Sequence, residues 1–312
     1  MRGDREQSLT LSDSQFRRFR DFFRDHCGLH FGEDSRFLLE KRLARRVRAL
    51  DLGGFAAYHY ALRTDSSGDD EVAAAIDELT TNETYFFREG SQLRALVEEI
   101  LPEALARRRA HTSGPVSLWS AGCSSGEEAY SIVMMAREAG FEPGVDFRVY
   151  ASDISRKVLQ KARQGVYRPA SFREEGLESY RKRYFTEQGG LWKISDEIKR
   201  HVVFTRVNLL DPSRVGLLGP MDVVLCRNVI IYFDLETKRK VVERFYDKLV
   251  PGGYLLLGHA ESLINVSNAF VLAHLKNDLV YRRPLPGEEV LDPWHAAARA
   301  ALSPLDLEDG SP

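Results

Sequence analysis

The sequence predicts an α/β protein whose larger part is a mostly parallel sheet with helices on both faces. Two observations predict this class. After about residue 115, short apolar runs alternate with helical segments, and the runs are "VSLW", "FRVYASD", "MDVVLCRN" and "YLLLG". Before about residue 85, apolar residues recur at helical spacing with no convincing strand between them. The chain therefore divides near residue 85 into a helical part and an α/β part.

The N-terminal part is predicted to be a small helical bundle. Its apolar residues recur at the spacing of helices with one buried face. The residues that carry this pattern are Phe16, Phe19 and Phe23, then Phe37, Leu38, Leu43 and Val47, then Tyr58 and Leu62. The polar stretch "TDSSGDD" (64–70) is predicted to be a loop, and "VAAAIDEL" after it resumes a helix.

Composition and charge exclude several classes of function. The chain has 312 residues, of which 43% are hydrophobic, and 44 Lys and Arg against 46 Asp and Glu give a net charge of -2. Such a chain, without a basic aromatic-rich groove, is not expected to bind nucleic acid. No run approaches the ~20 apolar residues of a membrane span, and the polar N-terminus has no apolar signal region. We therefore expect a cytoplasmic protein without membrane insertion.

Cysteine and histidine spacing indicates no metal site. The three cysteines, Cys27, Cys123 and Cys226, are odd in number and widely separated, which argues against a disulfide framework or a zinc cluster. The eight histidines show no metal-ligand spacing. We expect a protein that holds no metal ion.

The stretch "LWSAGCSSGEEAYSIVM" (118–134) predicts a buried strand, a turn of small residues and a helix that begins with two glutamates. Ligands of parallel sheets lie at the carboxyl ends of the strands, and Gly122 and Gly126 let the backbone approach one closely. A glutamate at this place repels phosphate and favours a cationic group. The next predicted strand ends in Asp153, which is placed to accept hydrogen bonds from ribose hydroxyls. A nucleoside with positive charge, such as S-adenosylmethionine, fits these features.

Six segments carry a resemblance to a known family. They are "LTTNETYFFRE" (79–89), "LWSAGCSSGEEAYSI" (118–132), "VYASDISRKVLQKARQGVY" (149–167), "VNLLD" (207–211), "CRNVIIYFD" (226–234) and "VPGGYLLLGHAESL" (250–263). In this order they are similar to the CheR family, the glutamate methyltransferases of bacterial methyl-accepting chemotaxis receptors. The resemblance covers about residues 10–283.

The resemblance implies a division of the chain. It implies an all-helical N-terminal domain with a linker at 1–85, and a Rossmann-type S-adenosylmethionine-dependent methyltransferase domain at 86–283. A small β-subdomain is expected at about 165–205. Residues 284–312 contain several prolines and acidic residues, and we expect a weakly ordered tail there.

The resemblance also implies the contacts with the cofactor S-adenosylmethionine and its product S-adenosylhomocysteine. Together with Gly122, they are Asn82, Thr84, Arg88, Glu128, Asp153, Asn208, Leu209, Asn228 and Val229. Structural interpretations remain open beside these roles. Thr80, Thr81 and Asn82 before Glu83 resemble the start of a capped helix, on which Arg88 would be a surface residue. Glutamates favour the positive end of a helix dipole, and Asp and Asn are typical turn residues.

Methylation of a glutamate needs no catalytic base, because a carboxyl with a pKa of about 4.3 is already ionised at neutral pH. Alignment with the sulfonium methyl group and removal of water remain to be supplied. We expect Arg88 to orient the incoming carboxylate and Tyr232 to hydrogen-bond it or line the pocket. Tyr232 also has an interpretation as a core residue of a β-rich segment.

A basic segment and a β-hairpin bear on the partner. "RFLLEKRLARRVRAL" (36–50) places Arg36, Lys41, Arg42, Arg45, Arg46 and Arg48 on a helix. Such a run is commonly a solvated face, but in the family this helix lies near the acidic methylation helices of the receptor. "RYFTEQGGLWKISDEI" has a Gly-Gly turn yet is shorter than the loop of members that bind a receptor C-terminal pentapeptide. We therefore expect a monomer that docks on receptor cytoplasmic helices without pentapeptide tethering.

The function predicted is a protein-glutamate O-methyltransferase of chemosensory adaptation. One alternative is a non-catalytic module that binds the cofactor or a receptor. Retention of the full set of candidate residues speaks against it. Another is a methyltransferase that acts on a small molecule or nucleic acid, which the near-neutral charge and the basic helical domain disfavour.

Overall fold

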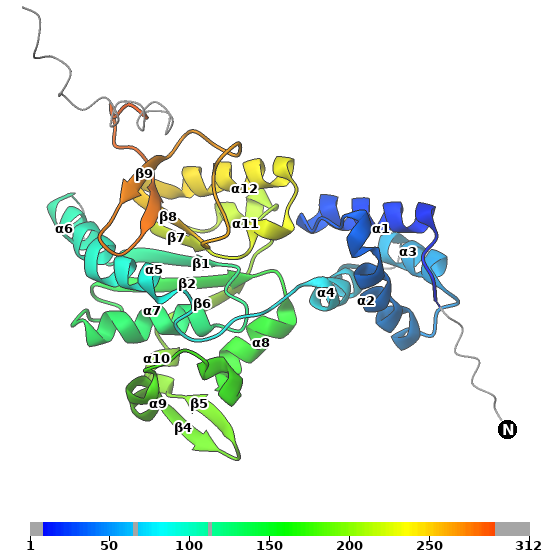
Figure 1. The fold of residues 1–312 in the computed structure, drawn as a ribbon, viewed down its shortest axis with the longest axis horizontal. Helices are drawn as coiled ribbons and strands as arrows, with labels where there is room; N and C mark the ends of the chain where they lie inside the picture. Colours follow the sequence, from blue (N-terminus) through cyan, green and yellow to red (C-terminus); the bar gives the residue numbers. More distant parts are fainter. Residues whose placement is uncertain (1–8, 65–67, 112–113, 291–312) are drawn as a thin grey trace, which may run out of the picture.

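The computed structural model describes residues 9–64, 68–111 and 114–290, and it places a helical N-terminal part beside an α/β part (Figure 1). The helices of the N-terminal part are α1 (Asp13–Cys27), η1 (Glu33–Ser35), α2 (Arg36–Ala49), α3 (Phe55–Thr64) and α4 (Gly68–Leu79). Among the described residues, none of the helices combines the length and the apolar character that crossing a bilayer would need.

The first helix shows how local sequence fixes an element. Ser12 caps α1 by accepting a hydrogen bond from the Gln15 backbone N–H, while the Gln15 side chain accepts one from the Ser12 backbone N–H. Phe16, Phe19 and Phe23 are buried in the helical core, as their spacing predicts. The helix ends at Gly28, which adopts φ 81° in the left-handed region that glycine tolerates.

Two sequence predictions for this part are wrong. Phe37 and Leu38 are exposed, at 71% and 39%, because the buried stripe of α2 is made instead by Leu39, Leu43, Ala44 and Val47. The predicted loop at 64–70 is too long, since α3 runs to Thr64 and α4 already begins at Gly68. Three acidic residues in the first turn of α4 suit the positive end of its dipole.

The α/β part is built on a seven-stranded sheet with the order β6-β2-β1-β7-β8-β10-β9, which confirms the predicted mostly parallel sheet. The pairs from β6 to β8 are parallel, whereas β10 is antiparallel to both β8 and β9. The strands are β1 (Val116–Ala121), β2 (Phe147–Asp153), β6 (Val202–Arg206), β7 (Met221–Cys226), β8 (Leu249–Leu257), β9 (Val271–His274) and β10 (Leu279–Arg282). Strand order reverses between β1 and β7, so the crevice of this sheet lies at their carboxyl ends.

Helices cover both faces of the sheet (Figure 1). Neighbouring residues of a strand point to opposite faces, so Leu118 and Val223 belong to one core cluster while Trp119 and Val224 belong to another. The first face is covered by α5 (Gly90–Ala95), the π-helical turn η2 (Leu96–Ile100), α6 (Leu101–His111), α7 (Glu127–Glu138) and α8 (Arg156–Gln164). The second face is covered by α11 (Pro212–Gly216) and α12 (Leu235–Lys248).

A small antiparallel sheet with the order β3-β5-β4 follows α8. Its elements are β3 (Val166–Tyr167), η3 (Pro169–Phe172), α9 (Glu178–Tyr184), β4 (Phe185–Gln188), β5 (Leu191–Ile194) and α10 (Asp196–Lys199). Gly189 and Gly190, with φ 60° and 78°, make the hairpin turn. The expected extent of about 165–205 reaches too far, because β6 pairs with β2 in the main sheet.

The two parts of the chain are fastened together beside the sheet edge. The His30 backbone N–H donates to the Tyr232 carbonyl at 2.9 Å, and the Asn208 side-chain amide donates to the His26 carbonyl at 2.6 Å. Arg156 of α8 forms an ion pair with Asp70 of α4. Of the tail expected at 284–312, residues 284–290 carry no helix or strand, and residues 291–312 lie outside the described residues.

Candidate cofactor site at the carboxyl edge of the sheet

A pocket opens at the carboxyl ends of β1, β2 and β7, beside the point where strand order reverses. Every site residue predicted from the sequence lines this pocket. These residues are Asn82, Thr84, Arg88, Gly122, Glu128, Asp153, Asn208, Leu209, Asn228, Val229 and Tyr232. The sheet thus brings together five segments that are far apart in the sequence, and the helical part contributes Cys27 and Leu29 as a sixth.

The turn after β1 forms the floor of the pocket. Gly122 has φ 82°, and a Cβ atom at this position would lie 2.4 Å from Val229 Cγ2. The Gly122 and Cys123 backbone N–H groups both donate to the Ser152 carbonyl, at 2.7 and 2.9 Å. A residue with a side chain would therefore both strain the backbone and collide with the turn after β7.

Asp153 ends β2 with its carboxylate held by the backbone. Oδ2 accepts from the Ser124 N–H at 2.9 Å and Oδ1 accepts from the Ser155 N–H at 2.9 Å. Burial raises the pKa of Asp153 above its ordinary value, and these N–H groups act in the opposite direction. Each oxygen keeps a lone pair that can accept a hydroxyl hydrogen bond from a ligand.

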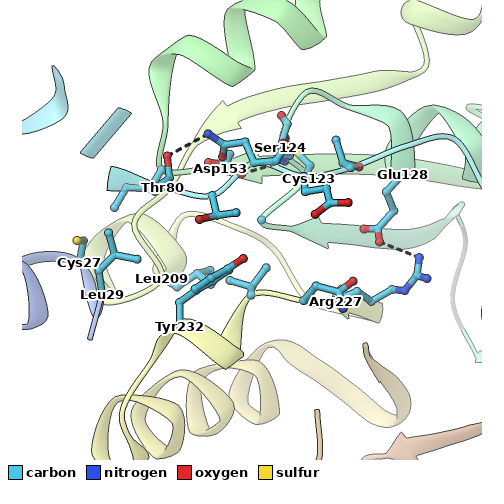
Figure 2. A pocket seen from close by; sticks show the side chains of 18 of the residues that line it. Cys27, Leu29, Thr80, Cys123, Ser124, Glu128, Asp153, Leu209, Arg227 and Tyr232 are labelled. Carbon is cyan, nitrogen blue, oxygen red and sulfur yellow. Dashed lines mark hydrogen bonds and ion pairs between the residues drawn. The ribbon is translucent and has the colours of Figure 1, made fainter. Parts of the chain in front are cut away.

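The two glutamates at the start of α7 have different environments. Glu128 faces the pocket, where Oε1 accepts from Ser120 Oγ at 2.6 Å and Oε2 lies 3.0 Å from Arg227 Nη1. Glu127 is buried on the other side, where Ser125 Oγ donates to it at 2.8 Å, and burial raises its pKa. Figure 2 shows Asp153 and Glu128 well apart in the pocket, with Tyr232 beside Leu209 on the wall across from Asp153.

Arg227 lines the pocket, although sequence reasoning did not select it. Its side chain is 2% exposed and also lies 3.1 Å from Glu89 Oε2. Its Nη2 donates to the Arg88 carbonyl at 2.5 Å, while its buried Nε has no hydrogen-bond partner. The sequence does hold a signal for Arg227, which follows directly after a buried strand in "CRN" and so lies at the carboxyl edge of the sheet, where ligands bind.

The predicted capped helix at residues 80–88 is wrong. Residues 80–85 are irregular, and the next helix begins at Gly90. The chain is instead tied to the pocket, since the Asn82 carbonyl accepts from Ser124 Oγ at 3.3 Å. Arg88 therefore lies in a bend, where Nη1 donates to the Glu83 carbonyl at 3.0 Å.

Asn208 has both side-chain groups engaged within the protein. Its amide nitrogen donates to the His26 carbonyl, and its Oδ1 accepts from the Leu210 backbone N–H at 3.0 Å. This residue closes the pocket against the helical part of the chain. Sequence reasoning missed the contribution of Cys27 and Leu29, because nothing local to "HCGLH" indicates which surface covers it.

The surroundings of the three cysteines disfavour the reactive thiolate form. Cys27, Cys123 and Cys226 are free and buried, and burial raises the pKa of each, for Cys27 to about 12. The described residues contain no group of three or more side chains arranged to hold a metal ion.

The donor set fits S-adenosylmethionine. A carboxylate with free lone pairs suits ribose hydroxyls, a second carboxylate across the pocket suits an ammonium group, and the unpartnered Nε of Arg227 suits a carboxylate. Glycine at 122 keeps the floor open to a nucleoside. The fold and the site define an S-adenosylmethionine-dependent methyltransferase.

Comparison with known proteins gives the family. Residues 82–278 match the CheR methyltransferase SAM-binding domain, and residues 14–80 match the CheR methyltransferase all-alpha domain. The chain belongs to the CheR methyltransferase family.

Curated relatives match over most of their length. Chemotaxis protein methyltransferase 2 of Vibrio cholerae is 40% identical over 281 residues, which cover 90% of this chain and 96% of the relative. The chemotaxis protein methyltransferase of Salmonella typhimurium is 38% identical over 270 residues, which cover 85% of this chain and 90% of the relative. That of Escherichia coli is 37% identical over 270 residues.

Proposed function

We propose that this protein transfers a methyl group from S-adenosylmethionine to glutamate side chains of chemoreceptor cytoplasmic helices. The observation that carries the proposal is the pocket at the carboxyl edge of the sheet, which joins every predicted cofactor and catalytic residue in a chain of this family. The names of the relatives, chemotaxis protein methyltransferases, indicate the receptor class. The helical part, residues 1–85, docks the receptor, and residues 86–283 carry out the transfer.

The roles of the cofactor-binding residues follow from their surroundings. Asp153 accepts the ribose hydroxyls, because its carboxylate is fixed by two backbone N–H groups and retains free lone pairs. Glu128 holds the ammonium group of the methionine part, and Arg227 neutralises Glu128 and donates to the methionine carboxylate. Asn82, Thr84, Leu209, Asn228 and Val229 shape the remaining walls.

The chain needs to position the substrate rather than remove a proton from it. The bound cofactor supplies a methyl group on a positively charged sulfur. A glutamate carboxylate is ionised at neutral pH, so the protein has only to align it and exclude water. Arg88 orients the carboxylate by its charge, and the Tyr232 hydroxyl donates a hydrogen bond to it. Tyr232 is suited to this because its own backbone is anchored to His30.

We assign the docking surface to only part of the basic face of α2. Of the basic residues on α2, Arg36 pairs with Asp13, Arg45 with Glu78 and Arg46 with Glu71. Lys41 and Arg48 are exposed and have no carboxylate partner among the residues that the structure describes. These two cations are available to an acidic receptor helix. Docking proceeds without pentapeptide tethering, since the strands β4 and β5 are joined by only two glycines, a loop shorter than that of family members that bind the pentapeptide. The protein acts as a monomer.

The proposal is tested with labelled S-adenosylmethionine and a receptor cytoplasmic fragment. We expect label in the fragment that mild alkali releases, because carboxyl methyl esters hydrolyse whereas N-methyl products persist. Alkali-stable label would indicate a different acceptor. Binding of S-adenosylhomocysteine without any transfer would identify a non-catalytic binding module instead.

A further inference from the structure

Glu261 lies outside the pocket lining, yet its carboxylate accepts four backbone N–H groups. Oε2 accepts from Asn228 at 2.7 Å and from Gly258 at 2.8 Å. Oε1 accepts from Val229 at 2.9 Å and from Ile231 at 3.2 Å. Three of the four donors belong to the turn after β7, which forms a wall of the pocket.

The backbone of this turn has a strained conformation that needs support from neighbouring residues. Asn228 adopts φ 59°, in the left-handed region that few residues with side chains occupy and that asparagine enters more readily than most. Its backbone also lies against Gly258, where an added Cβ atom would come within 2.9 Å of the Asn228 nitrogen and 2.6 Å of its Nδ2. A strained residue of this kind persists when its surroundings over-determine it, and the Glu261 carboxylate supplies that restraint.

The restraint bears directly on the site. Asn228 and Val229 line the pocket, and the same turn continues into η4 (Ile230–Tyr232), which ends in the tyrosine proposed to meet the substrate. On the other side of the turn, Glu89 accepts from Asn228 Nδ2 at 3.4 Å and from the His259 N–H at 3.3 Å. Burial raises the pKa of Glu261, while its four N–H partners act in the opposite direction and favour the carboxylate.

We propose that Glu261 is a positioning residue for methyl transfer, which fixes residues 228–232 through four backbone hydrogen bonds so that the cofactor wall and Tyr232 keep their places. The inference rests on the proposed function, because it assigns the geometry of that same site. Glu261 touches neither cofactor nor substrate in this account and acts through the turn.

The test is Glu261→Gln, which keeps the length of the side chain but replaces one acceptor oxygen with an NH2 group that faces two N–H donors. We expect the affinity for S-adenosylhomocysteine, measured by calorimetry, and kcat for methyl transfer each to fall roughly 10- to 100-fold, as for a small misplacement of reacting groups. The KM for the receptor fragment should stay within a factor of two or three, because the four backbone bonds of Glu261 go to the turn and to Gly258 and none goes to α2. A role confined to stability would lower Tm and leave affinity and kcat unchanged at a temperature where the variant is folded.

Two further variants distinguish a displaced turn from a general folding defect. Glu261→Asp keeps both oxygens on a shorter side chain and should recover part of the lost affinity. Gly258→Ala places a methyl group against Asn228 and should reproduce the loss. Glu243→Gln, on an exposed position of α12, is the matched control and should behave as the wild type.

The outcomes separate this inference from the proposed function. A folded Glu261→Gln protein with affinity and kcat within a factor of two of the wild type would overturn the inference alone. A wild-type protein that binds no S-adenosylhomocysteine would overturn the proposed function together with it. If the wild type binds S-adenosylhomocysteine but methylates no receptor, the affinities of wild type and Glu261→Gln still decide the inference, because that measurement needs no methyl acceptor.

Discussion

Glu128 and Arg227 form an ion pair of 3.0 Å between Oε2 and Nη1 at the carboxyl edge of the sheet. The Arg227 side chain is almost fully buried and also contacts Glu89, so one cation balances two carboxylates beside the pocket. A buried charge that loses its partner is costly, which makes this pair a point where stability and cofactor binding depend on the same atoms.

Arg227→Met should therefore lower the free energy of unfolding by about 3 kcal/mol, because it leaves Glu128 and Glu89 without their shared partner. It should also weaken S-adenosylhomocysteine binding. Urea unfolding and calorimetry measure the two effects. Arg183→Met, which removes an exposed partner of Glu138, is the control and should change both far less. Equal effects of the two substitutions would contradict the importance of the buried pair.

Gly122→Ala should reduce the affinity for S-adenosylhomocysteine about 10-fold or more, since the new methyl group meets Val229 and the backbone has a positive φ. Adding Val229→Ala removes the collision but not the backbone strain. We therefore expect the double variant to recover part of the affinity, and a double-mutant cycle measures the coupling. Strictly additive effects would show that the close approach of the two residues does not matter.

Asp153 makes cofactor affinity depend on pH. Its folded-state pKa lies above the ordinary value of 3.8 because of burial, so the carboxylate gains a proton at a higher pH than an exposed aspartate does. The sign follows directly: affinity for S-adenosylhomocysteine is full at neutral pH and falls as pH decreases through that raised pKa. The same shift means that the folded state binds a proton at Asp153 more readily than the unfolded state does. The contribution of Asp153 to the free energy of unfolding is therefore present below pH 3.8 and is lost as pH rises through the raised pKa.

Asp153→Asn is the matched variant for this pH dependence. It should bind about 10- to 100-fold more weakly at neutral pH, because a charged acceptor is lost, and its acidic decline should be reduced. Calorimetry across a pH series at constant ionic strength measures both curves. Parallel curves for wild type and variant would assign the decline to another group.

Lys41→Glu with Arg48→Glu should lower kcat/KM for the receptor fragment about 10-fold at low salt, because two exposed cations of α2 become anions that repel acidic helices. The loss should shrink as salt rises, and affinity for S-adenosylhomocysteine should not change. Lys182→Glu, an exposed charge reversal in the β-subdomain, is the control for net charge. An equal loss with Lys182→Glu would move the docking surface away from α2.

Ser12→Ala should lower the free energy of unfolding by about 1 kcal/mol, since it removes the side-chain cap of α1 and half of the capping box. Arg17→Ala, on an exposed position of the same helix, should have a much smaller effect. Chemical unfolding of both variants provides the measurement. A loss from Arg17→Ala as large as that from Ser12→Ala would show that the cap is not the cause.

Short apolar runs predicted β1, β2, β7 and β8 of the parallel sheet, because a buried strand reveals itself within a few residues of sequence. They did not predict β6, which was expected in the β-subdomain. The same local logic failed at Phe37 and Leu38, which are exposed at the start of α2 although Leu43 and Val47 of the same predicted set are buried. It also failed at residues 80–88, where a capped helix was predicted. The chain is irregular there because the Asn82 carbonyl bonds to Ser124 in the turn after β1.

The sequence by itself determined the α/β class, four strands of the parallel sheet and half of the residues that line the pocket, since each of these leaves a periodic or motif-level pattern in a short stretch of chain. Only the tertiary structure decided how the pocket is closed and balanced. The Asn208 bond to His26 spans 182 residues, the Arg227 pair with Glu128 spans 99, and the Glu261 bonds to the turn after β7 span about 30. Hydrogen-bond partners so far apart are chosen by the packing of whole elements, which no local pattern specifies.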